Sequence, residues 1–384
     1  MDFILILGIV LILSALSCKT TNRFGLPILV GFIFMGIFMG NWYKFEDNNT
    51  AMQLCNFALL LIIFCAAFRT DYAEVKPALA VSAVLSAAGT LLTALALSVF
   101  AYYALKLEFY QAALLGSVIS STDSASVFSV LRSRQIDLKN KLNTVFEVES
   151  SSNGPFAHML TTVFLALALG SSQGVFSLLI PQIVLGLLSG FIFAKLGQIF
   201  INRINLDIDG IYGAILCGIA FIIYGAAVQV GGNGFLAVYV GGVILGNGKL
   251  VYKGYLTRLS DAISILLQIT LFIVLGMLLI PSAIRTVLAD ALVFALFLLF
   301  IARPVFTYAL MKPFRYSLRE IALVSWAGFR GGSSIVFATI VLTAGFPYSE
   351  YVFSVVFFVC MLSVTIQGPF IVPIARKLKL IEDD

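Results

Sequence analysis

Residues 149–155 read Glu-Ser-Ser-Ser-Asn-Gly-Pro and lie in the middle of an apolar run from Leu142 to Leu169. A run of that length is typical of a membrane-spanning helix. A carboxylate at mid-span costs about 2.5–3.5 kcal/mol on insertion scales, so a span that retains one usually faces a pathway or a partner. Pro155 has no N–H, so the carbonyl of Ser151 loses its helical donor. A free carbonyl beside hydroxyl and amide oxygens suits a small hard cation. A kinked, tightly packed helix would explain Pro155 but not Glu149.

The composition of the whole chain is that of an integral membrane protein. Of its 384 residues, 60% are apolar and only 11% are charged, against about 25% charged in ordinary globular domains. The formal net charge of +5 does not indicate a nucleic-acid partner, because the basic residues fall in short stretches between apolar runs. The five cysteines lie within or beside apolar runs without metal-like spacing, so we interpret them as packing residues. We expect no cofactor and no resident metal.

The apolar runs predict an all-α polytopic membrane protein with about thirteen transmembrane helices. The predicted spans are 2–18, 24–42, 51–68, 77–104, 109–131, 141–169, 174–201, 209–229, 234–247, 257–280, 284–311, 319–344 and 350–374. Alternate loops collect 19 Lys and Arg residues on one side and 3 on the other. Basic loops face the cytoplasm, so we expect the N-terminus outside and the C-terminus inside.

Polar or glycine-rich tracts interrupt two of these spans at mid-depth. They are Ser120–Ser124 in the fifth span and Gly328–Ser334 in the twelfth. If the chain has two six-helix halves, at about 1–170 and 205–380, the interruptions occupy corresponding positions. The offset of seven spans makes the repeat inverted. Discontinuous helices in matching places of two inverted halves are typical of the substrate site of a secondary transporter.

Where two broken helices cross, their ends leave unpaired N–H and C=O groups. Asp123 is placed to offset the positive ends, and Arg330 to offset the negative ones. The carbonyl and hydroxyl of Thr122 would then face the site as neutral oxygen ligands, whereas Asp123 has the alternative role of a cap that never touches an ion. Arg330 cannot lose its proton and needs a carboxylate when buried. We expect that partner to be Glu149, which shares a helix face with Asn153 one turn later.

Four stretches resemble the monovalent cation:proton antiporter-1 family, and within it the bacterial NhaP-like branch that includes potassium/proton exchangers. They are GSVISSTDSASVFSVLRSR (116–134), EVESSSNGPFAHMLTTV (147–163), GGNGFLAVYVGGVILGN (231–247) and SWAGFRGGSSIVFA (325–338). The resemblance implies a homodimer in a bacterial inner membrane. Each protomer would have a core from spans 4–6 and 11–13, which moves like an elevator, and a dimerisation region from the remaining spans. Relatives often continue into a cytoplasmic regulatory domain, which we do not expect in this chain, 1–384.

The same resemblance assigns roles to individual residues. Thr122 and Asp123 match the Thr-Asp at the helix crossing, Glu149 and Arg330 match the intramembrane ion pair, and Asn153 matches the Asn of an Asn-Asp pair. Gly154 stands where the family has the aspartate that binds cation and proton in competition. The resemblance therefore places the cation and proton site at Thr122, Asp123, Ser150, Ser151, Asn153 and Gly154.

Two interpretations of Gly154 remain open. Either the glycine disables transport, or the site has moved onto Asp123, the serines, Asn153 and water. Competition needs a group that is either protonated or ion-bound, and Asp123 is the nearby candidate if Glu149 stays paired. We expect exchange of K⁺, Na⁺ or Li⁺ for H⁺ across the bilayer to be impaired. A weaker field at the site penalises sodium and lithium more than potassium, which favours K⁺ as the substrate.

Other classes of function fit the sequence less well. An intramembrane aspartyl protease needs two deep aspartates, and only Asp123 lies deep; a serine protease would need His158 beside Ser150 or Ser151, without a recognisable nucleophile motif. His158 is expected to be a packed, hydrogen-bonded residue, and a histidine's change of charge near neutral pH would also suit it to tuning a pH response. A channel would need a continuous polar lining. A non-transporting membrane sensor or scaffold derived from an antiporter is the main alternative.

Overall fold

The computed structural model describes residues 8, 12, 28–40, 48–123, 126–127, 130–131, 136–204, 206, 208–279 and 281–382. Regular structure in these residues is helical, apart from one β-bridge between Leu138 and Ile381. The longer helices are α2 (Ile28–Gly40), α3 (Asn48–Arg69), α6 (Thr90–Ala104), α7 (Phe109–Ile119), α9 (Leu142–Ala168), α10 (Val175–Arg203), α11 (Asp209–Gln229), α12 (Gly234–Asn247), α13 (Lys253–Met277), α14 (Pro281–Phe297), α15 (Arg303–Met311), α16 (Leu318–Trp326), α17 (Gly332–Thr343) and α18 (Ser349–Lys377). The shorter elements are α4 (Tyr72–Val75), α5 (Leu79–Val84), η1 (Leu85–Gly89), η2 (Lys139–Lys141), η3 (Leu298–Ala302) and η4 (Lys312–Phe314).

Helices lie over each predicted span from 24–42 to 350–374. The predicted span 2–18 falls outside the described residues, except for Gly8 and Ile12, which are helical. Seven helical stretches in the described part of the chain are long and apolar enough to cross a membrane. The all-helical membrane fold is therefore confirmed.

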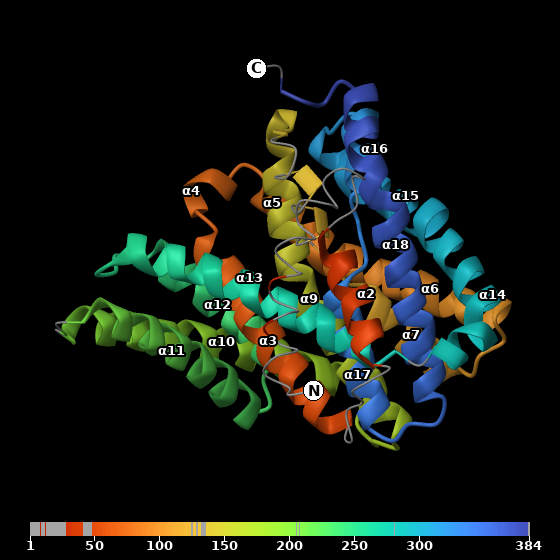
Figure 1. Ribbon diagram of the computed structural model, residues 1–384, viewed down its shortest axis with the longest axis horizontal. Coiled ribbons are helices and arrows are strands. Elements are labelled where there is room, and N and C mark those ends of the chain that lie inside the picture. The colour runs from red at the N-terminus through yellow and green to blue at the C-terminus, as the bar shows by residue number, and fades with distance from the viewer. Residues whose placement is uncertain are drawn as a thin grey trace.

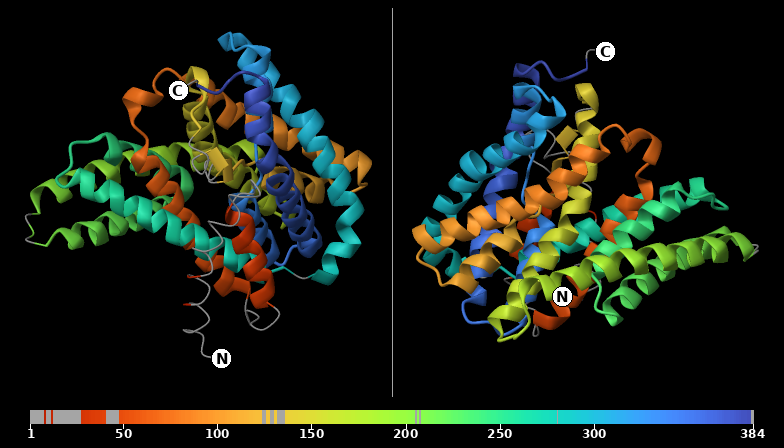
Figure 2. Two further views of the ribbon diagram at one scale, coloured as in Figure 1. Left: turned by 45° about the horizontal axis from the view of Figure 1, so that its top comes forward. Right: turned by 180° about the vertical axis from the view of Figure 1, so that it is seen from behind.

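The helices form two groups (Figure 1). The group on the left of this view contains α10, α11, α12 and α13, and α3 packs against α12 and α13. The group on the right contains α6, α7, α14, α15 and α18. The rotated views in Figure 2 keep these groups apart, with α9 between them in contact with α7 on one side and with α10 and α12 on the other.

Glycines let neighbouring helices of the first group approach closely. A Cβ on Gly36 of α2 would lie 2.9 Å from the Cα of Gly276 on α13. A Cβ on Gly242 of α12 would lie 2.7 Å from the carbonyl oxygen of Phe64 on α3. Close backbone approach through small residues is typical of helix packing in membranes, where no hydrophobic effect draws helices together.

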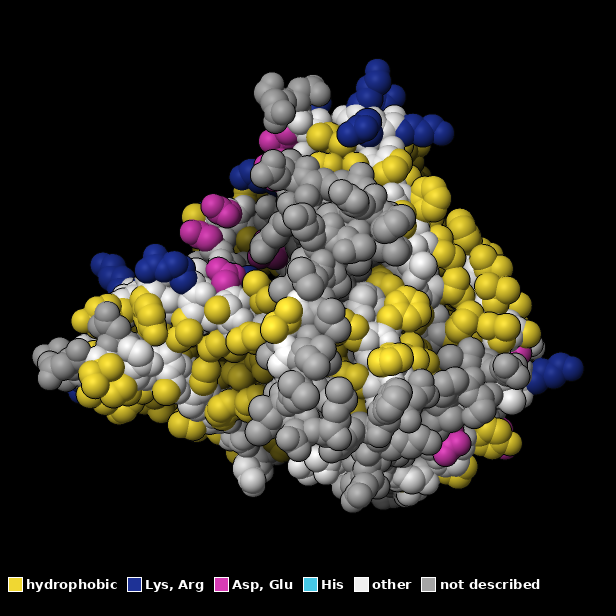
Figure 3. Space-filling view, in the orientation of Figure 1, with side chains coloured by type: hydrophobic (Ala, Val, Ile, Leu, Met, Phe, Trp, Pro, Cys, Tyr) yellow, Lys and Arg dark blue, Asp and Glu magenta, His cyan; other side chains and the backbone are white. Residues whose placement is uncertain are grey.

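The surface matches a protein surrounded by lipid. Hydrophobic side chains cover both flanks in Figure 3, whereas most of the visible Lys and Arg gather at the top and upper left. Helix α10 carries a row of exposed apolar residues that includes Phe176, Ile180 and Phe191. This polarity agrees with the loop charges but leaves the direction of insertion a prediction.

Both predicted interruptions are present. Helix α7 ends at Ile119, and residues 121–123 are not helical. Helix α16 ends at Trp326, and α17 begins at Gly332. Helix α9, by contrast, runs from Leu142 to Ala168 through Pro155. The structure therefore has two broken helices beside one continuous helix that carries the polar stretch.

Candidate functional site

The two breaks meet directly. The backbone N–H of Asp123 donates to the carbonyl of Phe329 at 2.8 Å. The Nη1 of Arg330 donates to the carbonyls of Ser120 and Ser121, at 2.5 and 2.8 Å. These carbonyls follow the last turn of α7, where a helix leaves acceptors unpaired and negatively polarised. Arg330 therefore offsets the C-terminal end of α7, as the sequence predicts.

The side chain of Asp123 lies at a helix N-terminus, that of α17. A Cβ built on Gly331, the residue before α17, would overlap the Asp123 carboxylate, with its Cγ only 2.7 Å away. The carboxylate oxygen Oδ2 also accepts a hydrogen bond from the hydroxyl of Ser126 at 2.8 Å. An anion at a helix N-terminus stabilises the exposed N–H groups. The Asp123 carboxylate thus lies beside the N-terminus of α17, and its role as a cap or as an ion ligand stays a prediction.

Thr122 lies against α9 and joins the polar residues there. Its hydroxyl donates to Ser150 Oγ at 3.1 Å and lies 3.4 Å from Glu149 Oε2. Its N–H donates to Asn153 Oδ1 at 3.2 Å, and Asn153 Nδ2 donates back to the Thr122 hydroxyl. All four residues are buried. The arrangement concentrates neutral and charged oxygens at the crossing, and such oxygens are ligands for a hard cation.

The serines of the motif have different surroundings. Ser150 is part of the oxygen cluster, with its hydroxyl 3.3 Å from Glu149 Oε2. Ser151, also predicted as a ligand, donates to the carbonyls of Glu147 and Val148 in its own helix, at 2.6 and 3.3 Å. Ser121, which was not predicted, donates to Asn153 Oδ1 at 3.1 Å and lies 3.0 Å from the hydroxyl of Ser333. Ser121 therefore takes the place at the crossing that was expected for Ser151.

The partner of Glu149 differs from the prediction. Its Oε1 forms an ion pair with Nη1 of Arg303 on α15, at 3.1 Å. The predicted pairing with Arg330 is wrong, because the Nη1 of Arg330 is engaged by the α7 carbonyls. Asn153 does share a face with Glu149, and its Nδ2 donates to Glu149 Oε1 at 3.3 Å. Glu149 therefore ties α9 to α15.

The sequence contained a signal for Arg303. Of the 24 Lys and Arg residues, 22 were assigned to the two membrane sides from the sequence, and the remaining two are Arg303 and Arg330. A basic residue inside an apolar span needs a buried partner, and this signal applies to Arg303, although only Arg330 was considered from the sequence. The choice between the two arginines depended on the three-dimensional arrangement of the helices, which places Nη1 of Arg303 3.1 Å from Glu149 Oε1.

Gly154 lies on the buried face of α9. A Cβ added there would meet one atom within 4 Å, the hydroxyl oxygen of Ser121 at 3.8 Å. That distance is an ordinary van der Waals contact, so a larger side chain would start without a clash and point toward the crossing. The position therefore accommodates a Cβ, which is the first atom of the aspartate side chain that the family resemblance leads us to expect.

Comparisons with known proteins agree with this geometry. A family model described as "Sodium/hydrogen exchanger, transmembrane" matches residues 9–377. The chain is 33% identical over 385 residues to the K(+)/H(+) antiporter NhaP of Alkalimonas amylolytica, covering 98% of this chain and 67% of that relative.

It is 32% identical over 393 residues to the K(+)/H(+) antiporter NhaP2 of Shewanella baltica, covering 99% of this chain and 67% of that relative. The fold also matches the sodium proton antiporter MjNhaP1 of Methanocaldococcus jannaschii, with a TM-score of 0.85 at 20% identity over 98% of this chain and 99% of that one.

The chain belongs to the sodium/hydrogen exchanger family. It is thus a multi-pass membrane protein from a family of cation/proton antiporters, which are transporters and not enzymes.

The single histidine of the chain, His158, is held by hydrogen bonding and packing, as the sequence predicts. The Nδ1 of His158 lies 2.8 Å from Nδ2 of Asn233, whose Oδ1 accepts from the N–H of Leu236 at the start of α12. The ring also packs edge-on against Phe235 and Phe337. These contacts explain His158 without a role at the helix crossing.

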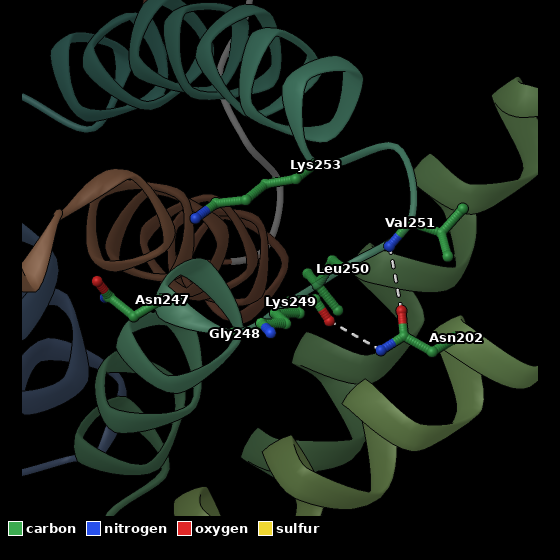
Figure 4. A pocket seen from close by; sticks show the side chains of 7 residues that line it. All are labelled: Asn202, Asn247, Gly248, Lys249, Leu250, Val251 and Lys253. Atoms are coloured by element: carbon green, nitrogen blue, oxygen red, sulfur yellow. Dashed lines mark hydrogen bonds between the residues drawn. The ribbon is translucent and has the colours of Figure 1, made fainter.

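A surface hollow of about 620 Å³ lies away from the crossing, at the loop between α12 and α13. Figure 4 shows Asn202 of α10 holding that loop through the carbonyl of Lys249 and the N–H of Val251, at 2.8 and 3.1 Å. Lys249 and Lys253 line the hollow and no carboxylate does. This chemistry does not suit a cation, so the crossing remains the candidate cation site of this chain.

Proposed function

We propose that this chain is a secondary active transporter that exchanges a monovalent cation, K⁺ or Na⁺, for protons by elevator-type alternating access. The transported ion would be dehydrated at the crossing of the two broken helices, with Thr122, Asp123, Ser150 and Asn153 as its surroundings. The observation that carries the proposal is the direct contact between the breaks, through Asp123 N–H to Phe329 and Arg330 to Ser120 and Ser121. In secondary transporters, such contacts between discontinuous helices surround the substrate.

Exchange by competition requires a carboxylate that holds either the cation or the proton. Glu149 is paired with Arg303 and hydrogen-bonded to Asn153, so its negative charge is already balanced. Among the described residues named at the crossing, Glu149 and Asp123 contribute two negative charges, and Arg303 and Arg330 contribute two positive charges. The sum is zero, so no net formal charge at the crossing offsets the loss of the cation's hydration shell.

An aspartate at position 154 would change that sum to one negative charge. It would also supply a titratable oxygen on the face of α9 that looks toward Ser121. We therefore propose that the chain retains the exchanger architecture but is impaired in exchange, because Gly154 removes the group for which cation and proton compete. Residual exchange would depend on Asp123.

The same charge argument bears on ion preference. A neutral site with hydroxyl, amide and carbonyl oxygens has a weak field, and it recovers less of the hydration energy of a small ion than of a large one. Sodium and lithium are therefore penalised more than potassium. The names of the two antiporter relatives, which specify K(+)/H(+) exchange, support the same choice.

Proteoliposomes test the proposal. Vesicles carrying an outward-directed or inward-directed pH gradient would receive K⁺, Na⁺ or Li⁺, and the decay of the gradient would be measured. We expect slow decay with the native chain and decay at least about tenfold faster with Gly154→Asp, corresponding to roughly 1.4 kcal/mol at the site. Gly154→Asn provides a control of similar size without charge, and Gly154→Ala a control for the added Cβ. Equal rates for all four proteins would exclude Gly154 as the cause of impairment.

The second candidate function is a membrane sensor or scaffold derived from an antiporter. Gly154 is the observation that favours it, because a protein selected for transport would be expected to keep a titratable group there. The same vesicles separate the two: a scaffold gives no cation-dependent decay with the native chain at any pH, whereas an impaired exchanger gives a slow decay that rises with cation concentration.

A further inference from the structure

Helix α18 supplies side chains to the break between α16 and α17. Gln367 and Ser363 lie four residues apart on α18, so they share one face of the helix. Both are buried, with exposed fractions of 1% and 0%. A fully buried amide and hydroxyl in a membrane helix need hydrogen-bond partners, and here the partners lie in the break.

The hydrogen bonds form a chain from one side of the break to the other. Gln367 Nε2 donates to the carbonyl of Trp326, the last residue of α16, at 2.6 Å. Gln367 Oε1 accepts from the hydroxyl of Ser363. The Ser363 oxygen accepts in turn from the N–H of Arg330, at 2.9 Å. Trp326 closes the loop, because its Nε1 donates to the backbone carbonyl of Gln367 at 3.1 Å.

Two of these bonds pair backbone groups that the helix ends leave without a helical partner. The carbonyl of Trp326 belongs to the last turn of a helix, where the chain offers it no helical donor, and the N–H of Arg330 precedes the first turn of the next. Buried backbone groups of this kind must be paired from elsewhere. One amide and one hydroxyl on α18 satisfy an acceptor on the α16 side and a donor on the α17 side.

Fixing the backbone of Arg330 also fixes the origin of its side chain. The guanidinium extends to the carbonyls of Ser120 and Ser121, at the break of the other discontinuous helix. A shift of the Arg330 backbone would therefore move the contact between the two breaks, beside Thr122 and Asp123.

We infer that Gln367 and Ser363 are positioning residues for the cation site: they hold the α16–α17 break and thereby place Arg330 on the carbonyls that end α7. The inference rests on the proposed function, since it assigns the held break a role in cation binding. Neither side chain touches the ion in this account.

The test uses the full chain in the Gly154→Asp background, where exchange is expected to be measurable. The variants are Gln367→Met, which has a side chain of similar length without amide groups, and Ser363→Ala. Val364→Ala is the matched control, because Val364 is buried on the same helix and its truncation removes packing without removing a hydrogen bond. Ser363→Thr keeps the hydroxyl and serves as the rescue.

Two measurements are made on each protein. The first is hydrogen–deuterium exchange of the amides at 327–331. We expect it to be about tenfold faster in Gln367→Met and Ser363→Ala, the effect of losing roughly one buried hydrogen bond. The second is the dependence of vesicle pH decay on cation concentration. We expect the apparent KM for the cation to rise about tenfold in these two variants and to return toward the starting value in Ser363→Thr.

Val364→Ala is expected to lower the melting temperature while leaving both measurements near their starting values. The inference is overturned if amide exchange at 327–331 is unchanged in Gln367→Met and Ser363→Ala, or if Val364→Ala reproduces their effects. If Gly154→Asp alone shows no exchange in vesicles, the proposed function fails, and amide exchange at the break still decides whether α18 holds it.

Discussion

Glu149 and Arg303 form an ion pair that is almost fully enclosed. The side chains of Arg303 and Glu149 are 5% and 3% exposed. Removing one partner of such a pair leaves a charge in a medium that cannot solvate it, and this typically destabilises a protein by about 3–5 kcal/mol. Loss of either partner alone is therefore expected to be costly, whatever net stability the intact pair contributes.

Substitution of Arg303 tests the cost of leaving Glu149 without its partner. We expect Arg303→Met to lower the melting temperature markedly in detergent, because Glu149 would be left buried and charged. The double variant Arg303→Met with Glu149→Met should recover most of the loss, since an apolar pair of similar volume is often as stable as a buried ion pair. A double variant no more stable than Arg303→Met would contradict the pairing.

The ion pair between Arg69 and Asp261 is the natural control. Its side chains are 22% and 47% exposed. Exposed pairs contribute about 0–1 kcal/mol. Arg69→Met should therefore change the melting temperature far less than Arg303→Met does.

The broken helices α7 and α16–α17 place their ends with little free space. Gly331 lies against the Asp123 side chain so closely that a Cβ would overlap it. An overpacked buried site typically costs about 1–3 kcal/mol, and here the displaced group is the carboxylate at the N-terminus of α17. The glycine is therefore required for the crossing of the two breaks.

Gly331→Ala should lower both stability and exchange, because its Cβ would displace the Asp123 carboxylate. We expect a lower melting temperature, and in the Gly154→Asp background slower vesicle pH decay than with glycine at 331. Gly218→Ala on α11 is the control, because nothing lies within 4 Å of a Cβ there, and alanine favours a helix interior over glycine by about 0.5–1 kcal/mol. If Gly331→Ala and Gly218→Ala change the melting temperature and the vesicle pH decay equally, the close contact of Gly331 with Asp123 is not the cause of the effect.

The elements show what a sequence can and cannot predict. The interruptions near Ser120 and Gly328 were predictable, because polar and glycine-rich tracts inside apolar runs are local features. The positions of Asp123 beside a helix N-terminus and of Arg330 at a helix C-terminus followed from the polarity of helix ends. The partner of Glu149 did not, because Arg303 lies 154 residues away and only the packing of α15 against the site brings it close.

The role of Gln367 was missed for the same reason. A glutamine in an apolar helix predicts a buried partner, but the partner is a backbone carbonyl at a break in another helix. Backbone acceptors carry no sequence signature. Ser151 follows Ser150 on α9, and the turn of about 100° per residue directs its hydroxyl to the carbonyl of Glu147 in its own helix.

The whole molecule has a charge asymmetry that predicts its orientation. The loops on one side carry 19 Lys and Arg residues and those on the other carry 3. We expect the C-terminus in the cytoplasm and the loop after α6 outside. Single cysteines in a cysteine-free chain test this, at the exposed positions Lys379 and Lys106. In intact cells a membrane-impermeant maleimide should label Lys106→Cys and not Lys379→Cys, and the reverse pattern would invert the topology.

Cation and proton compete for one carboxylate in the exchanger that we propose, and position 154 decides whether that carboxylate is present. The most direct measurement is the number of protons released when saturating K⁺ is added to purified protein in weakly buffered solution. For Gly154→Asp we predict release of about half a proton per chain at a pH equal to the pKa of that carboxyl group, rising toward one at a pH well below the pKa if K⁺ still saturates the site, because cation binding must displace the proton. The native chain should release far fewer. Equal release by the native chain and Gly154→Asp would contradict the account.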